Sequence, residues 1–142
     1  MTTELTLPEM NGDTEPWWEA TRHSRLLIQH CRTCDRFQHY PRPICVSCHG
    51  LDLTFDEVSG RGSIYSFSVV HRSPNPELHE APYVVALVRL EEGPVLFTSI
   101  VDCPFADLRC DQAVEIAWRP LPDGRQLPVF SPMNFSPTKG VA

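Results

Sequence analysis

From residue 51 onward, hydrophobic and polar side chains alternate along the chain. Leu51, Leu53 and Phe55 alternate with polar residues, as expected for a strand with one buried face. The same pattern predicts further strands at 63–71, 83–90, 95–101 and 113–119, a final hairpin at 123–124, and a helical turn within 105–110. Turn-forming prolines and glycines separate most of these segments. This part of the chain is therefore predicted to be mainly β.

A series of short strands with polar turns is typical of a small barrel, because closure removes exposed strand edges. The oligonucleotide/oligosaccharide-binding (OB) barrel fits best. Gly60-Arg61-Gly62 precedes the first long strand, where an OB barrel needs a bulge or a tight coil. These glycines do not predict a phosphate-binding loop, since a strand follows them and the third glycine is replaced by Tyr65.

The N-terminal third predicts one short helix. Thr14 is a suitable N-cap, Pro16 is tolerated in a first turn, and the helix is expected to run to about His23. Trp17 and Trp18 point about 100° apart on a helix, so we expect one ring to pack on this chain and the other on another molecule, unless a groove between two modules buries both. Residues 25–30 then predict a strand.

Four cysteines follow that strand in two Cys-x-x-Cys pairs. This spacing predicts a structural zinc site with four thiolate ligands and no open position for water, formed by Cys31, Cys34, Cys45 and Cys48. Two disulfides, a redox pair or iron in the same geometry are the alternatives. His30, His39 and His49 lie close by in sequence. They are expected to contact the cysteine ligands without binding the metal, or to lie on the surface. Cys103 and Cys110 are expected to be free, partly buried thiols.

Length and charge narrow the functional class. The chain has 142 residues, 42% hydrophobic side chains, 14 prolines and a formal net charge of −6, to which four thiolates and one Zn²⁺ add a further −2. Residues 17–50 carry five arginines against two acids, whereas 51–142 carry seven basic and twelve acidic side chains. The negative net charge disfavours nonspecific nucleic-acid binding. The modest basic patch beside the zinc site would either bind RNA or a phosphorylated cofactor or consist of solvated arginines. With no leader pattern and no long apolar run, a cytoplasmic location is predicted.

No catalytic motif of the serine-hydrolase, zinc-protease or P-loop type occurs in the sequence. An independent enzyme would have to use His71, His79 and Glu80 in the proline-rich loop 72–82, without an evident nucleophile. A nucleic-acid-binding zinc-ribbon/OB protein is the second alternative. A binding module that acts with another protein is the interpretation we favour.

The order of motifs along residues 14–130 resembles the acyl-CoA-associated zinc-ribbon/OB-fold family. The motifs are Pro16-Trp17-Trp18, Cys31-x-x-Cys34, Tyr40-Pro41-Arg42-Pro43, Cys45-x-x-Cys48, Ser59-Gly60-Arg61-Gly62, Pro82-Tyr83-Val84-Val85-Ala86 and Leu90-Glu91-Glu92-Gly93. The resemblance implies a tail at 1–13, a helix and rubredoxin-like zinc ribbon at 14–56, an OB barrel at 57–130 and a tail at 131–142.

The resemblance also implies a function. Members look like companion subunits of thiolase-superfamily enzymes, so the expected partner is a thiolase or a thiolase-fold aldolase acting on an acyl-CoA, in a heterotetramer. The partner would supply the catalytic groups, and this chain would complete the acyl-CoA pocket. The expected contacts with the CoA thioester or the partner are Arg61, Tyr65, Arg72, Arg119 and Arg125.

Overall fold

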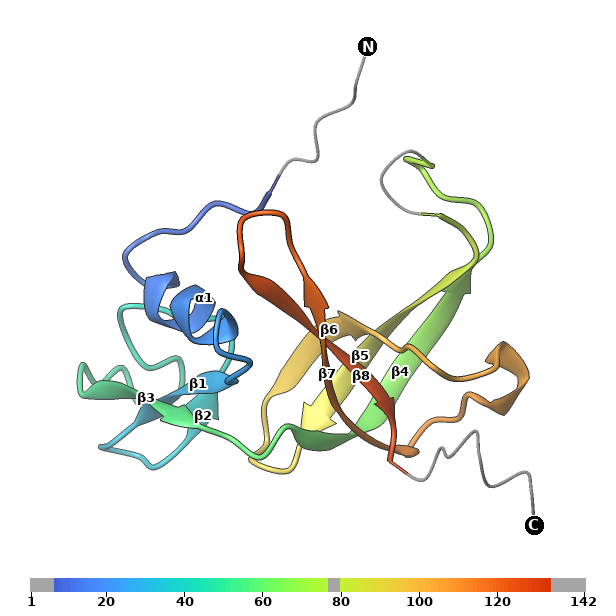
Figure 1. The fold of residues 1–142 in the computed structure, drawn as a ribbon. Coiled ribbons are helices and arrows are strands. Elements are labelled where there is room, and N and C mark those ends of the chain that lie inside the picture. Colours follow the sequence, from blue (N-terminus) through green and yellow to red (C-terminus); the bar gives the residue numbers. More distant parts are fainter. Residues whose placement is uncertain (1–6, 77–79, 134–142) are drawn as a thin grey trace.

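A computed structural model describes residues 7–76 and 80–133. Two sheets and one helix make up the fold, with an N-terminal ribbon beside a C-terminal barrel (Figure 1). His79 and the outer parts of both predicted tails lie outside the described residues. Within the described part, no helix is long and apolar enough to cross a membrane.

The ribbon is built on a three-stranded antiparallel sheet in the order β2-β1-β3. Its strands are β1 (Leu27–Cys31), β2 (Phe37–Gln38) and β3 (Leu53–Glu57). β1 pairs with β2 through Gln29 opposite Gln38, and with β3 through Leu27 opposite Glu57. The central strand therefore delivers Cys31 directly into the first turn between β1 and β2.

The barrel is a five-stranded antiparallel sheet in the order β6-β5-β4-β7-β8. Its elements are β4 (Arg61–Val70), β5 (Tyr83–Leu90), β6 (Val95–Ser99), the 3₁₀ turn η1 (Phe105–Asp107), β7 (Ala113–Pro120) and β8 (Gln126–Pro132).

The barrel closes between β6 and β8. A parallel bridge joins Ile100 to Phe130, and the Val101 N–H donates to the Phe130 carbonyl at 2.8 Å. The Thr98 hydroxyl adds a bond of 2.9 Å to the Pro128 carbonyl. Phe130, fully buried, lies in the core that these strands enclose. The predicted mainly β fold with an OB-type barrel is confirmed.

Gly60, before β4, and Gly62, at its start, form the predicted tight coil. Gly60 has φ +77°, a conformation that suits glycine, and a Cβ at Gly62 would lie 2.3 Å from the Arg89 carbonyl oxygen. The bulge itself lies farther along the strand, between Ile64 and Ser66. The glycines thus form the tight coil and the close strand approach, while the strand bends a few residues later.

Helix α1 spans Glu15–Thr21, two residues shorter than predicted. Thr14 occupies the N-cap position, yet its side chain makes no capping bond to the helix. Asn11 instead accepts the Thr14 N–H at 3.0 Å, forming a turn that leads into α1. Beyond the end of the helix, Ser24 adopts φ +56°, where the chain turns toward β1.

The expectation that one tryptophan of α1 packs on another molecule is wrong. Trp17 and Trp18 are each only 8% exposed, with their rings edge to face at 4.6 Å. α1 lies beside both the ribbon and β8, so both rings find apolar surroundings on this chain (Figure 1). The Arg125 guanidinium stacks over Trp18 at 4.6 Å.

Polar contacts fix α1 to the barrel. The Gln126 side-chain amide donates to the Thr21 carbonyl at 3.0 Å and to the Ser24 hydroxyl at 2.7 Å. Arg22 donates to the Asp123 carbonyl at 2.7 Å. Since the apolar core runs without interruption from α1 and β1 into the barrel, ribbon and barrel form one packed unit.

Candidate metal centre and ligand pocket

The four predicted cysteines converge on one point of the ribbon. Their Sγ atoms all lie within 4.8 Å of one another, with Cys31 3.6 Å from Cys48 and Cys34 3.7 Å from Cys45. Four sulfurs at about 2.3 Å from one Zn²⁺ in a regular tetrahedron are about 3.8 Å apart. These separations fit a zinc ion and are far too long for disulfides, and all six cysteines of the chain are free.

Each Cys-x-x-Cys pair is held in the same local conformation. The Asp35 N–H donates to the Cys31 carbonyl and the His49 N–H to the Cys45 carbonyl, both at 2.9 Å. Asp35 and His49 have φ +62° and +63°, so each turn closes with a left-handed residue directly after its second cysteine. Two equivalent turns therefore present their sulfurs to a shared centre.

Backbone N–H groups stabilise negative charge on the sulfurs. Cys45 Sγ accepts from the N–H groups of Cys48 at 3.5 Å and Ser47 at 3.4 Å, and these bonds lower the Cys45 pKa to about 6. Burial raises the pKa of Cys34 to about 12. A bound cation would supply the positive charge that keeps all four sulfurs deprotonated.

The neighbouring histidines have other contacts. His30 is buried, and its two ring nitrogens each lie 2.7 Å from a carboxylate, of Asp35 and of Asp56. His49 is exposed, and His39 packs beside Trp17 with ring centroids 5.7 Å apart. In the described ranges, only the four cysteines form a cluster that could hold a metal.

A buried glutamine pair ties the two metal turns together. Gln29 accepts from the Arg42 N–H at 2.9 Å and returns a bond of 2.7 Å to the Arg42 carbonyl. Gln38 donates to Gln29 at 2.6 Å and accepts from the Val46 N–H at 2.9 Å. The loop 39–44 is thus attached to β1 and β2 through side chains, which holds the second cysteine pair opposite the first.

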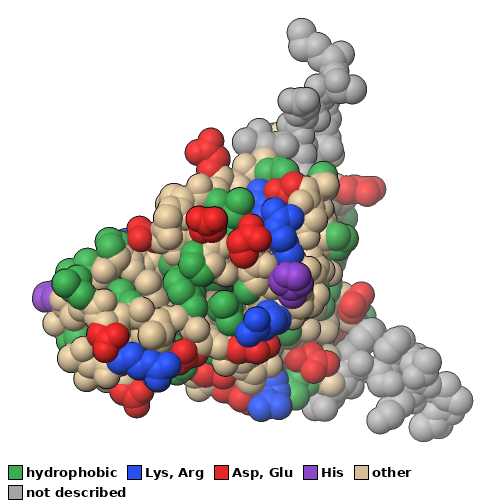
Figure 2. Space-filling view, turned by 60° about the vertical axis from the view of Figure 1, so that its left-hand side comes forward, with side chains coloured by type: hydrophobic (Ala, Val, Ile, Leu, Met, Phe, Trp, Pro, Cys, Tyr) green, Lys and Arg blue, Asp and Glu red, His purple; other side chains and the backbone are tan. Residues whose placement is uncertain are grey.

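The predicted basic patch beside the zinc site is largely neutralised. Three of its five arginines form ion pairs with acidic side chains: Arg22 with Glu19, Arg25 with Glu57 and Arg32 with Asp56. Acidic and basic groups are interspersed over one face of the molecule, around a group of hydrophobic side chains (Figure 2). This surface lacks the continuous positive field that nucleic-acid binding requires.

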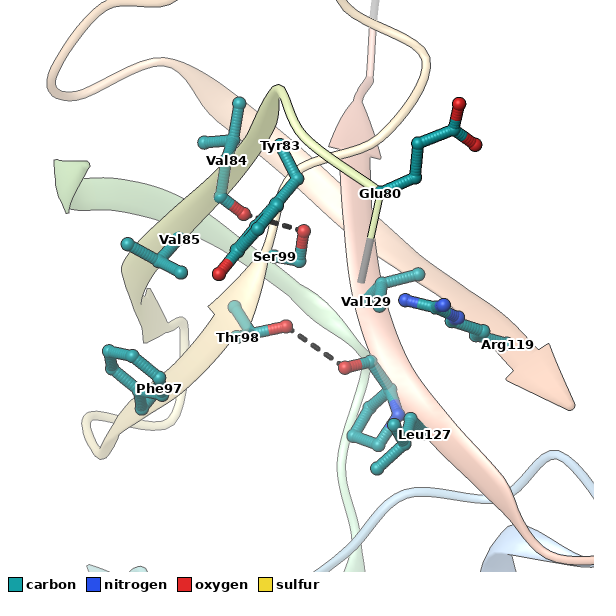
Figure 3. Close-up of a pocket in the computed structure, with 11 residues that line it drawn as sticks. Glu80, Tyr83, Val84, Val85, Phe97, Thr98, Ser99, Arg119, Leu127 and Val129 are labelled. Atoms are coloured by element: carbon teal, nitrogen blue, oxygen red, sulfur yellow. Dashed lines mark hydrogen bonds between the residues drawn. The ribbon is translucent and has the colours of Figure 1, made fainter. Parts of the chain in front are cut away.

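A cavity of about 450 Å³ opens on the barrel between β5, β6 and β8 (Figure 3). The hydroxyls of Thr98 and Ser99 bond to strand carbonyls, of Pro128 at 2.9 Å and Val84 at 2.6 Å. Those hydroxyls therefore hold the wall together. Glu80 and Arg119 supply the charged groups at the rim, and the remaining lining is mostly apolar.

The structure does not bring the five predicted CoA or partner contacts together. Arg119 alone among them lines the cavity just described. Arg61 pairs with Glu91 at 3.2 Å, Tyr65 lies under the Arg89 guanidinium at 4.5 Å, and Arg72 is exposed after β4. Arg125 is 3% exposed and pairs with Asp123 at 2.6 Å. Its guanidinium is therefore committed to the seam between α1 and the barrel.

A second cavity, of about 240 Å³, lies where α1, the loop 39–41 and the barrel meet. It shares Phe97, Leu127 and Pro128 with the first cavity. Burial lowers the pKa of His39, which lines it, to about 4. Phe97 is 65% exposed and lies between the cavities. Sequence reasoning missed this residue, although the alternation along 95–99 places it on the outer face of its strand.

The residues of the independent-enzyme alternative do not form a catalytic group in the part of the chain that can be described. Glu80 lines the larger cavity and His71 is exposed.

Cys103 is half-buried, and burial raises the pKa of its thiol. Cys110 is exposed, whereas the sequence predicted a partly buried thiol. Neither cysteine lines a cavity described above.

Two family models match most of the chain. Residues 18–54 match the rubredoxin-like zinc ribbon domain of ChsH2, and residues 56–119 match the C-terminal OB-fold domain of ChsH2. A DUF35 domain-containing scaffold protein of Methanocaldococcus jannaschii is 34% identical over 105 residues, which cover 72% of this chain and 74% of that protein. This chain belongs to the DUF35 family. Its four-cysteine site is the metal site of a zinc ribbon, and the four sulfurs fit structural zinc.

Two further relatives are longer proteins. The probable enoyl-CoA hydratase alpha subunit of Thermomonospora curvata is 38% identical over 125 residues, covering 88% of this chain and 39% of that protein. The 3-oxo-4,17-pregnadiene-20-carboxyl-CoA hydratase alpha subunit of Mycobacterium tuberculosis is 36% identical over 61% of this chain and 27% of its own length. This DUF35 chain thus spans well under half of those two relatives.

Solved structures of the family share the fold. A chain of the Ltp2-ChsH2(DUF35) aldolase superposes with a TM-score of 0.81 at 38% identity, covering 89% of this chain and 98% of that one. A DUF35 protein of unknown function from Sulfolobus solfataricus gives a TM-score of 0.58 at 14% identity, covering 74% and 77%. The second likeness shows the fold alone.

Proposed function

We propose that this chain is a non-catalytic companion subunit of a thiolase-fold enzyme, an aldolase or a thiolase, that acts on an acyl-CoA. The observation that carries the proposal is the match along 98% of a chain in the Ltp2-ChsH2(DUF35) aldolase. The match covers nearly the whole of that chain, and this supports a similar subunit role. We expect a heterotetramer in the cytoplasm.

The chemistry of the described residues supports an accessory role. Four thiolates complete the coordination of zinc, so the metal offers no position at which water or a carbonyl oxygen could be activated. The larger cavity is mostly apolar, and the hydroxyls of Thr98 and Ser99 in its lining are engaged with backbone carbonyls. Such a surface can position a ligand and exclude water, while the nucleophile and base come from the partner.

The proposed CoA contacts follow from exposure and charge. Arg119 lies at the rim of the larger cavity without an ion-pair partner among the residues described, and Arg72 is exposed on the loop after β4. Both are suited to the pyrophosphate or adenosine phosphate of CoA. Arg61 and Tyr65 are proposed contacts with the partner or CoA. Arg125 would act indirectly, by holding Trp18 and the turn before β8 in place.

Capture from the native cell tests this proposal. The tagged chain is purified under mild conditions, and co-purifying proteins are identified by mass spectrometry. We expect one thiolase-fold protein in a one-to-one ratio. The reconstituted complex should cleave or condense acyl-CoA substrates faster than the partner alone. Turnover of an acyl-CoA thioester by the isolated chain, or capture of no thiolase-fold protein, would overturn the proposal.

A further inference from the structure

Strand β5 is apolar on both of its faces. Val84, Ala86 and Val88 are buried in the barrel core, whereas Val85 and Leu87 alternate with them and lie on the outer face of the sheet. A sheet with one face in water usually alternates hydrophobic and polar residues, and continuous hydrophobic strands are typical of sheets covered on both sides. The composition of β5 therefore indicates that its outer face is covered by another molecule.

The neighbouring strands extend this apolar outer face. On β6, the exposed Phe97 lies directly opposite Leu87. On β4, the exposed Ser66 lies opposite Leu87, and the exposed Ser68 lies opposite Val85. These five residues line a groove of about 190 Å³, and Val85 and Phe97 project toward the same side of the sheet (Figure 3). A groove beside an exposed aromatic ring is suited to the side chains of another protein.

One end of this face carries a positive charge. Arg89 is the next outward residue of β5, and its guanidinium lies over the Tyr65 ring at 4.5 Å. It has no acidic partner among the residues described, and the nearby Glu91 is already paired with Arg61 at 3.2 Å. Stacking on Tyr65 holds the guanidinium without neutralising it. A complementary surface would therefore be apolar, with a carboxylate at the edge that meets Arg89.

We infer that the outer face of β4, β5 and β6 is the docking surface for the partner subunit. The partner contributes apolar side chains to the groove around Leu87 and Phe97, and a carboxylate to Arg89. This inference rests on the proposed companion function and adds to it the face by which the partner is bound.

A second copy of this chain fits the face less well. The three strands contain no Asp or Glu, so the same surface used twice would bring two copies of Arg89 together without a carboxylate from these strands. The groove also shares Val85 and Phe97 with the larger cavity. A partner bound here would thus lie next to the proposed acyl-CoA site, where its catalytic groups are needed.

A matched pair of variants tests the docking face. Leu87 lines the groove but neither of the two cavities, and Leu51 is an exposed leucine on the ribbon. The full chain is titrated into its captured thiolase-fold partner by calorimetry. We expect Leu87→Thr to bind at least about tenfold more weakly than the unmodified chain, since it removes an apolar contact at the centre of the interface. Leu51→Thr should bind as tightly as the unmodified chain.

The charge is tested separately, through the rate of association. Arg89→Gln should lower the association rate constant by about threefold at low salt and weaken its dependence on salt, because the attraction to the partner's carboxylate is lost. Arg89→Lys keeps the charge and should keep the salt dependence. Identical salt dependence of Arg89→Gln and the unmodified chain would mean that Arg89 meets no acidic group.

Methyl spectra of the unmodified chain decide the matter even if Leu87→Thr does not fold. On addition of the partner, the methyl signals of Val85 and Leu87 should shift, and those of Leu51 should not. Shifts of Leu51 without those of Val85 and Leu87 would place the interface on the ribbon and overturn the inference. Shifts of Val85 and Leu87 that appear only as the isolated chain is concentrated would assign the face to a second copy, which also overturns it.

Failure of this inference can be told apart from failure of the proposed function. If the unmodified chain and Leu87→Thr capture the thiolase-fold partner equally well, or if Leu51→Thr weakens binding as much, the docking face is wrong and the companion role stands. If the unmodified chain captures no thiolase-fold protein, both are overturned.

Discussion

His39 should make the stability of this protein depend on pH in a predictable window. Burial lowers its pKa from the ordinary 6.5 to about 4 in the folded chain. Between these two values the unfolded chain binds a proton that the folded chain does not, so stability falls as the pH drops through this range. Above pH 6.5 both states are neutral at this position, and the effect disappears.

The magnitude follows from the two pKa values. At pH 5 an unfolded histidine with a pKa of 6.5 is almost fully protonated, and the difference from the folded state corresponds to about 2 kcal/mol of lost stability. For a chain of 142 residues this lowers the melting temperature by about 7 °C. Because His39 is only partly buried, these values are upper limits.

The assay compares His39→Phe with the unmodified chain. Urea unfolding at several pH values from 7.5 to about 5, with zinc in the buffer, gives the free energy of unfolding of each. The variant should lose about 2 kcal/mol less than the unmodified chain over this range. Taking the difference cancels the contribution of zinc release in acid, which both chains share. The exposed His71→Gln serves as the control and should follow the unmodified chain. Parallel curves for His39→Phe and the unmodified chain would refute the reasoning.

Three further changes test the metal site, the seam and the core. Cys34→Ser removes one of four sulfur ligands, so the zinc content by mass spectrometry should fall from one ion per chain to near none; retention of a full ion would contradict the four-thiolate site. Gln126→Leu removes the bonds to Thr21 and Ser24 and should cost about 1–2 kcal/mol, with faster amide exchange in α1; unchanged exchange would mean that the seam does not stabilise the helix. Phe130→Ala empties a fully buried site and should cost about 3–5 kcal/mol in urea unfolding, and a loss below about 1 kcal/mol would show that β8 is not part of the core.

The barrel and the metal ligands were predictable because their signals are local. Alternation along a strand reports which face is buried, as in β5, where Val84, Ala86 and Val88 point inward. Two Cys-x-x-Cys pairs define a metal site by spacing alone. The exposed Phe97 follows from the same alternation, but nothing in the sequence indicates that two cavities meet beside it.

The misjudged residues depend on partners far away in sequence. Both tryptophans of α1 are buried because the helix lies between the ribbon and β8, an arrangement that no helical period reveals. Arg125 is buried because its guanidinium pairs with Asp123 in a neighbouring turn and stacks on Trp18. Trp18 lies more than 100 residues earlier in the sequence. The paired arginines of the ribbon were likewise misjudged, since charge counts do not reveal which acidic side chain lies across the sheet.

The seam between α1 and β8 limits how the protein can be divided. The two family models meet at residues 54–56, which suggests a natural place to cut the chain into halves. The smaller cavity, however, takes Trp17 and His39 from the first half and Phe97 and Leu127 from the second. Cutting there would leave either fragment with an incomplete wall and an exposed apolar surface. Excised modules should therefore aggregate, and engineering that swaps ribbons between family members must transplant the matching β8 sequence as well.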